Sequence, residues 1–253
     1  MRMTRGLLFL CLISLSATSY AGELKLAVAA NFKATIEKIV AKFEQQTKHK
    51  ITITSASSGT LFSQISHGAP FDIFLSADSE RPIKLVKNNL ALADSRFTYA
   101  IGQLAFWTPK TQLTSQQSII SYIDSQKGKL AIANPRLAPY GKSAHIFIIK
   151  NNLALAVKST LINGNNVAQA FQFVESGNAQ SGMISYAQLR AAGISSDYIL
   201  LQPTSYPRIK QQAVILKNSK NIALARQLMD FIKTKNHQLI IDAGYLMETN
   251  NVD

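Results

Sequence analysis

Apolar and polar positions alternate along the chain in blocks that fit strands followed by helices. Residues 24–28 form an apolar run of strand length, and from Asn31 onward apolar residues recur with the 3.6-residue period of a helix, at Phe32, Ile36, Ile39, Val40 and Phe43. A second strand is predicted at 51–54, and a short helix follows it. A third, continuously apolar strand is predicted at 72–76. The order strand, helix, strand predicts a mainly parallel sheet of an α/β protein.

The second half of the chain repeats this order after a long extended stretch at 97–107. A strand is predicted at 129–133 and another at 181–186, with helices beginning near Tyr140 and Val167. A further extended segment covers 203–216, and helices at about 221–233 and 237–243 complete the pattern. We interpret the two long extended stretches as crossings between two lobes. This assigns residues 22–100 and 206–253 to a discontinuous first lobe and 101–205 to the second.

The first 21 residues have the pattern of a signal peptide. Arg2 and Arg5 precede an apolar run at 6–15, and Ser19-Tyr20-Ala21 offers the small residues that a signal peptidase reads. The run is short for a membrane anchor, which is the main alternative. A lipoprotein signal does not fit, because Cys11 lies inside the apolar run. We therefore expect export to the periplasm after cleavage behind Ala21. Cleavage would also remove the chain's single cysteine and with it any thiol chemistry.

Composition narrows the function classes. The 253 residues are 47% hydrophobic, which is enough for two lobes with their own cores, and no segment beyond the first 21 residues is apolar enough to span a membrane. The formal net charge of +13 raises the possibility of a nucleic acid or membrane partner. However, the basic residues are scattered at helix-surface spacing without interleaved aromatics, as at Lys33, Lys38 and Lys42. We expect no nucleic acid partner, and we expect the charge to attract small anions over a distance.

Candidate binding residues stand where predicted strands end and helices begin. Ligands of open α/β sheets bind at that edge, and five neutral residues occupy it: Asn31, Ser58, Tyr140, Val167 and Tyr186. Asn31 and Ser58 are also expected to be the N-caps of their helices. Neutral donors at helix N-termini can hold a fully ionised anion, whereas nearby carboxylates such as Asp72 and Asp78 would repel it. The pattern predicts a site for a small dianion.

These motifs resemble one family, the periplasmic molybdate-binding proteins of ABC importers, within the type II periplasmic binding proteins. In the first half, the residues that carry the resemblance are Ala27-Val28-Ala29-Ala30-Asn31-Phe32, Ser57-Ser58-Gly59-Thr60 and the segment 68–78, Gly-Ala-Pro-Phe-Asp-Ile-Phe-Leu-Ser-Ala-Asp. In the second half they are Asn134-Pro135, Ala138-Pro139-Tyr140-Gly141, Asn166-Val167 and Gly182-Met183-Ile184-Ser185-Tyr186. The likeness covers nearly the whole chain after residue 21.

The resemblance implies a hinged, two-lobe α/β fold and a function without catalysis, cofactor or metal of its own. Asn31 and Ser58 would give side-chain and backbone donors from the first lobe. Tyr140 and Val167 would give backbone N–H groups and Tyr186 its hydroxyl, so that these five residues touch the metal only through the oxygens of molybdate. The implied partners are molybdate or tungstate and the membrane permease of an ABC importer, and the protein would act as a monomer. Ala30 departs from relatives that carry a hydroxyl donor at this position.

Two alternatives remain open at the level of sequence. A hydrolase would require a nucleophile with a paired base, and His67 lies close to the serine pair, although the chain has neither a Gly-x-Ser-x-Gly nor a His-Glu-x-x-His motif. The same fold could instead bind sulfate, phosphate or an organic acid. Phosphate sites commonly include a proton acceptor and organic acid sites an arginine, and the candidate loops show neither. Sulfate shares the shape and charge of molybdate, so cavity size must separate the two.

Overall fold

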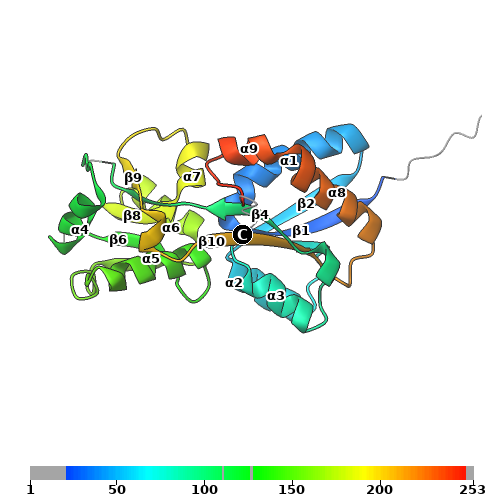
Figure 1. Cartoon of the computed structure of the whole chain (residues 1–253), viewed down its shortest axis with the longest axis horizontal. Helices are drawn as coiled ribbons and strands as arrows, with labels where there is room; N and C mark the ends of the chain where they lie inside the picture. Colours follow the sequence, from blue (N-terminus) through cyan, green and yellow to red (C-terminus); the bar gives the residue numbers. More distant parts are fainter. Residues whose placement is uncertain (1–20, 110, 126–127, 249–253) are drawn as a thin grey trace, which may run out of the picture.

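The computed structural model describes residues 21–109, 111–125 and 128–248, and these residues form two lobes arranged along the long axis of the molecule (Figure 1). Except for Ala21, the expected signal peptide lies outside the described residues. In the part of the chain that the structure describes, no helix is long and apolar enough to cross a membrane. The fold therefore rests on two separate sheets, each covered by its own helices.

The first lobe is built on a five-stranded sheet with the order β2-β1-β3-β10-β4. Strands β1, β2 and β3 are parallel, and β10 runs antiparallel to both of its neighbours. The strands are β1 (Glu23–Ala29), β2 (Lys50–Ala56), β3 (Ile73–Ser76), β4 (Phe97–Gly102) and β10 (Ile209–Ile215). The helices are the 3-10 turns η1 (Ala30–Phe32) and η2 (Ala93–Ser95), and α1 (Lys33–Thr47), α2 (Ser58–Ser66), α3 (Glu80–Lys87), α8 (Ile222–Lys235) and α9 (His237–Asp242).

The second lobe repeats this plan with the order β7-β6-β8-β5-β9. Strands β6, β7 and β8 are parallel, and β5 runs antiparallel to β8 and β9. The strands are β5 (Leu104–Trp107), β6 (Leu130–Ala133), β7 (Leu161–Gly164), β8 (Ser181–Ser185) and β9 (Tyr198–Leu200). The helices are α4 (Gln116–Asp124), α5 (Pro139–Lys150), α6 (Val167–Glu175), α7 (Tyr186–Ala191) and the 3-10 turn η3 (Pro203–Ser205).

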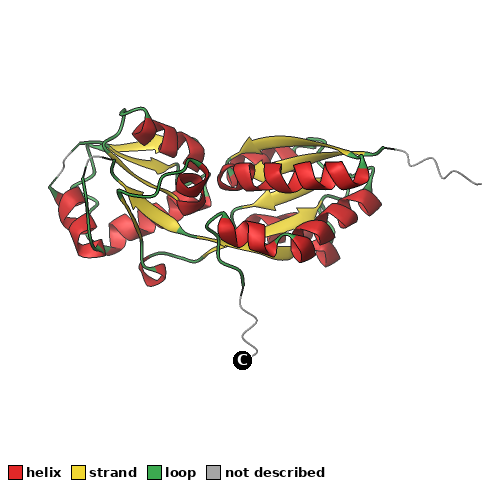
Figure 2. Cartoon of the chain, turned by 90° about the horizontal axis from the view of Figure 1, so that it is seen from above, coloured by secondary structure: helices red, strands yellow, loops and turns green. Residues whose placement is uncertain are grey.

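Helices cover both faces of each sheet, as the view from above shows (Figure 2). The central strand β3 is buried along its whole length, while the edge strand β2 alternates exposed and half-buried positions. This is the burial expected for central and edge strands of a covered sheet. Helices α1 and α8 bury their apolar faces on one side of the first sheet, through side chains such as Ile36, Ile39, Leu228 and Ile232. Leu61 of α2 and Leu85 of α3 pack on the other side.

The chain crosses between the lobes twice within the described residues. Gln103 alone separates β4 from β5, and residues 201–208 connect β9 to β10. In each sheet the single reversed strand, β5 or β10, is the strand that follows a crossing. The predicted two-lobe α/β fold with mainly parallel sheets and two crossings is therefore confirmed. Several short elements were not predicted: helices α3, α4 and α7, and strands β7 and β9.

Candidate functional site

Strand register brings the candidate residues together. Strands β1 and β2 are paired to their last residues, Ala29 with Ala56, so η1 and α2 begin side by side. In the second lobe β6 and β7 end level in the same way, at Ala133 and Gly164, and α5 and α6 begin beyond them. Because helix N-termini carry unpaired N–H groups and a partial positive charge, each lobe offers two such ends to the other.

These four chain segments enclose a small cavity between the lobes. Four of the five predicted residues line it: Asn31, Ser58, Tyr140 and Val167. The full lining is Ala29, Ala30, Asn31, Ser57, Ser58, Ala77, Ala138, Pro139, Tyr140, Asn166 and Val167, and none of these residues is charged. Its free volume is about 10 Å³, room for about one water molecule, so the four segments lie close together in this structure.

Ser58 is placed to donate its hydroxyl hydrogen. It is the first residue of α2, and Ser57 rather than Ser58 is the N-cap, since the Ser57 hydroxyl accepts from the backbone N–H of Thr60 at 3.1 Å. The expectation that Ser58 is the cap is wrong. Instead, Ser58 Oγ accepts from the backbone N–H of Ala77 at 2.9 Å. This contact uses an acceptor site on Ser58 Oγ and leaves its hydrogen available to a ligand.

Asn31 is likewise not an N-cap, because it lies inside the 3-10 turn η1, which begins behind Ala29 and leads directly into α1. Its side-chain amide donates to Gln211 Oε1 at 2.8 Å and to the Tyr245 hydroxyl at 3.1 Å. The Tyr245 hydroxyl in turn donates to the backbone carbonyl of Asn31 at 2.7 Å. Both hydrogens on Asn31 Nδ2 are therefore in use, and the donor that Asn31 can offer the cavity is its backbone N–H.

Tyr140 and Val167 lie in the first turns of α5 and α6. Pro139 begins α5 at a position where no N–H is needed, and the Asn166 side chain caps α6 by accepting from the backbone N–H of Gln169 at 3.0 Å. The N–H groups of Tyr140 and Val167 have no partner within their own first turns. The Tyr140 ring extends away into the protein and is buried, which raises the pKa of its hydroxyl well above the ordinary value of 10.0.

Tyr186 does not line the cavity. It begins α7, and its backbone N–H donates to the carbonyl of Gln103 at 3.0 Å. Its ring lies 5.5 Å from the Tyr198 ring and next to Gly244. Tyr186 follows β8, which lies on the side of β6 away from β7. Its side chain turns toward β9, so the hydroxyl is directed away from the other four residues.

The two lobes touch directly around the cavity. The backbone N–H of Gly59, in α2, donates to the carbonyl of Leu137, in the second lobe, at 2.8 Å. The Arg81 guanidinium donates to the Arg136 carbonyl at 3.3 Å while it pairs with Asp78. The ammonium group of Lys142 lies 3.6 Å from the Glu80 carboxylate. These contacts belong to a closed arrangement of the lobes, in which donors from both sides can reach one ligand.

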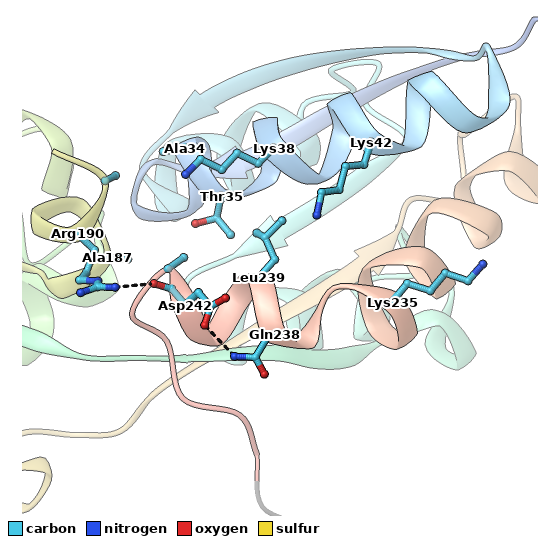
Figure 3. Close-up of a pocket in the computed structure, with 12 residues that line it drawn as sticks. Ala34, Thr35, Lys38, Lys42, Ala187, Arg190, Lys235, Gln238, Leu239 and Asp242 are labelled. Atoms are coloured by element: carbon cyan, nitrogen blue, oxygen red, sulfur yellow. Dashed lines mark hydrogen bonds between the residues drawn. The ribbon is translucent and has the colours of Figure 1, made fainter. Parts of the chain in front are cut away.

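A larger groove of about 540 Å³ lies elsewhere, between α1 and α9 of the first lobe and α7 (Figure 3). Lys38, Lys42, Arg190 and Lys235 line it with exposed side chains, and Arg190 donates to the backbone carbonyl of Asp242. Flexible, hydrated ammonium groups hold a small anion less firmly than N–H groups that the backbone fixes in place. The small cavity is therefore the better candidate, despite its size.

The geometry does not support a hydrolase. His67 is the C-cap of α2, and Ser58 begins this nine-residue helix, so about 13 Å of helix separates the two residues. The His67 ring is exposed and contacts the carbonyl of Ser63 at 2.7 Å. Among the described residues there is no group of three or more His, Cys, Asp or Glu side chains that could hold a metal ion.

Gln211 and Tyr245 belong to the surroundings of the site and were not predicted from the sequence. Gln211 is fully buried in β10, and Tyr245 is 1% exposed. The one available signal was a pair of glutamines, Gln211 and Gln212, in a segment otherwise typical of a buried strand. Buried amides of this kind need partners, and the carbonyl oxygen of Gln211 accepts from Asn31 and Tyr99.

Comparisons with known proteins identify the family of this chain. Residues 24–246 match the model of a family described as bacterial extracellular solute-binding proteins. The chain is 38% identical over 234 residues to molybdate-binding protein ModA of Azotobacter vinelandii, covering 91% of this chain and 92% of the relative. It is 35% identical to molybdate-binding protein ModA of Rhodobacter capsulatus, over 93% of each chain. The solved structure of the Azotobacter vinelandii periplasmic molybdate-binding protein superposes with a TM-score of 0.83 at 35% identity, covering 89% of this chain and 99% of that one.

Proposed function

Because the chain belongs to the family of bacterial extracellular solute-binding proteins, we propose that it captures molybdate between its lobes in the periplasm and delivers it to the permease of an ABC importer. The observation that carries the proposal is the convergence of four helix beginnings on one small, uncharged cavity. The two molybdate-binding relatives, each similar over more than nine-tenths of this chain, support the choice of ligand. The protein acts as a monomer and performs no catalysis.

Four residues give the donors of the proposed site. Ser58 contributes its hydroxyl hydrogen, and the first turns that contain Asn31, Tyr140 and Val167 contribute backbone N–H groups. Fixed N–H groups cannot lose their protons at physiological pH and need no reorganisation when the anion arrives. Each helix N-terminus also adds roughly half a positive charge near the ligand. The arrangement therefore favours a fully ionised tetrahedral anion such as molybdate.

Binding is coupled to closure. Asn31 and Ser58 lie in the first lobe and Tyr140 and Val167 in the second, so an anion that contacts all four residues is bound more tightly by the closed arrangement than by an open one. A ligand shifts such an equilibrium only by its difference in affinity for the two states. The contacts from Gly59 to Leu137 and from Arg81 to Arg136 then hold the closed form, which the permease recognises.

Calorimetric titration of the protein with molybdate, tungstate, sulfate and phosphate tests the proposal. We expect tight binding of molybdate and tungstate, and weaker binding of sulfate because its smaller ion leaves gaps between donors. Replacing Ser58 by alanine should weaken molybdate binding at least tenfold, since one directed hydrogen bond to a charged group contributes about 1.5–3 kcal/mol. Ser63→Ala, on the exposed face of the same helix, is the matched control. Tight sulfate binding without molybdate binding would refute the proposed ligand.

A further inference from the structure

A buried polar cluster lies directly behind the cavity and joins it to the crossing between the lobes. Its members are Asn31, Tyr99, Gln211 and Tyr245 from the first lobe and Tyr140 and Ser185 from the second, and each is at most 4% exposed. The centre of the cluster is Gln211, the third residue of β10, just after the second crossing.

Gln211 fixes the conformation of Asn31. Gln211 Oε1 accepts from Asn31 Nδ2 at 2.8 Å. The single hydrogen of the Tyr99 hydroxyl is shared between Gln211 Oε1 at 3.1 Å and the Ser76 carbonyl at 3.0 Å. The register of β10 against β4 shifts at this point: Gln211 pairs with Ala100 and Gln212 with Thr98, so Tyr99 of β4 is the residue left without a pairing partner. The irregularity therefore lies in β4 at Tyr99, the residue whose hydroxyl contacts Gln211.

The other end of the Gln211 amide faces the second lobe. A Cβ atom placed on Gly102 would lie 2.2 Å from the Tyr140 hydroxyl oxygen and 2.9 Å from Gln211 Nε2, so these two polar atoms approach the same point beside the first crossing. Neither atom has a hydrogen-bond partner among the described residues, and the same is true of the nearby Ser185 hydroxyl. Buried polar groups without partners are rare, and three around one point indicate a junction completed by a small movement or a bound water.

We infer that Gln211 is a positioning residue that couples closure of the lobes to the anion site: its carbonyl oxygen holds Asn31 in the first lobe, and its NH₂ group meets the Tyr140 hydroxyl from the second. Tyr140 then acts twice, through its backbone N–H at the cavity and through its hydroxyl at the crossing. Gly102 leaves the space in which the two groups meet, since any side chain there would separate them. The inference rests on the proposed function, because its readout is anion affinity.

Two variants test it, Gln211→Met and Tyr140→Phe, each of which removes polar atoms of the cluster and keeps the shape of the side chain and the backbone N–H groups. The matched control is Gln212→Met. Gln212 is the next residue of the same strand, 5% exposed, and its amide bonds instead to Arg96 at 2.7 Å and to Thr98 at 3.2 Å. Affinity and dissociation rate for molybdate, and the melting temperature without ligand, are measured for the wild type, these three variants and the Gln211→Met/Tyr140→Phe double variant.

We expect Gln211→Met and Tyr140→Phe each to weaken molybdate binding at least fivefold, mainly through faster dissociation. The dissociation constant of the double variant should be no more than about twofold above that of the single variant with the lower affinity. Residues that act as one unit are non-additive in this way. Gln212→Met should change the melting temperature but leave affinity within twofold. The inference is overturned if Gln211→Met binds like the control, or if the two losses multiply. Absence of molybdate binding by the wild-type protein would instead refute the proposed function.

Discussion

The contact between Gly59 and Leu137 predicts that Gly59→Ala stabilises the open form of the protein and destabilises the closed form. Gly59 is the second residue of α2 and has no positive φ angle, so alanine fits the helix there. A Cβ atom at this position would lie 2.8 Å from the Leu137 carbonyl oxygen and 3.0 Å from the Leu137 Cα atom, both in the opposite lobe. The clash with Leu137 therefore exists only when the lobes are closed, whereas the third neighbour, Arg81 Nη2 of the first lobe at 3.1 Å, is the far end of a flexible side chain.

The size of each change follows from two effects, the higher helix propensity of alanine and the clash with Leu137. In the open form, replacing glycine by alanine inside a helix stabilises it by about 0.5–1 kcal/mol. For a chain of this size that raises the melting temperature of the ligand-free protein by about 1–4 °C. In the closed form, overpacking against a backbone costs about 1–3 kcal/mol, and the hydrogen bond from the Gly59 N–H to Leu137 is strained as well. The dissociation constant for molybdate should rise about 5- to 150-fold.

Calorimetric titration with molybdate and thermal unfolding without ligand measure the two effects in Gly59→Ala. Small-angle X-ray scattering with saturating molybdate adds a direct readout, since the variant should remain more extended than the wild type. Ser63→Ala gives the control for helix stabilisation alone, because Ser63 lies in the same helix and is exposed. Unchanged affinity in Gly59→Ala would show that this contact is not part of the ligand-bound state. A lower melting temperature without ligand would show that the loss is general.

Three further predictions concern the charge at the site, the role of Tyr186, and stability at high pH. Asn31→Asp should reduce molybdate affinity more than a hundredfold in calorimetric titration, because it buries a carboxylate next to a dianion; binding within tenfold of wild type would contradict the proposed position of Asn31. Tyr186→Phe should leave affinity within twofold, since its ring lies against Tyr198 and Gly244, and a tenfold loss would return its hydroxyl to the site. Burial raises the pKa of Tyr99 and Tyr245 above the ordinary value of 10.0. Their neutral forms therefore stabilise the fold fully below about pH 10, and this contribution is lost as the pH rises further. Thermal melts should show a melting temperature that falls above pH 10, and less steeply in Tyr99→Phe.

From the sequence, the residues that line the cavity are easier to predict than the atoms that face it. Asn31 and Ser58 are predicted to lie together because residues that follow parallel strands meet at one edge of a sheet, and the level ends of β1 and β2 bring both residues to the cavity. Which group of each residue faces the cavity depends on distant partners. The Asn31 amide is engaged by Gln211, 180 positions away, and the Ser58 hydroxyl is oriented by Ala77.

The same reasoning about the sheet edge predicts that Tyr186 lies with the other four residues. In the structure its ring packs near Tyr198 and it does not line the cavity. The chain turns into α7 at Tyr186, a helix of six residues that is too short to leave a clear apolar period in the sequence. Its ring then follows the sheet outward toward β9. Helices α3 and α4 were not predicted for a related reason, since each buries only two side chains. A pattern needs several apolar repeats before it separates a helix from a loop.

The arrangement separates long-range attraction from local recognition. Exposed basic side chains such as Lys38, Lys42 and Arg190 contribute to the net charge of +13 and lie on the larger groove rather than at the small cavity. Such charges raise the local concentration of anions, and salt screens them. At the cavity the charge comes instead from helix N-termini, about +0.5 for each of α2, α5 and α6, and it is fixed in direction and independent of pH. In the proposed site, one helix N-terminus offsets only part of the charge of a dianion, so donors from both lobes are needed together. Discrimination between tetrahedral anions would then depend on the spacing of donors across the two lobes, and Gln211 is the residue that we propose to help fix this spacing.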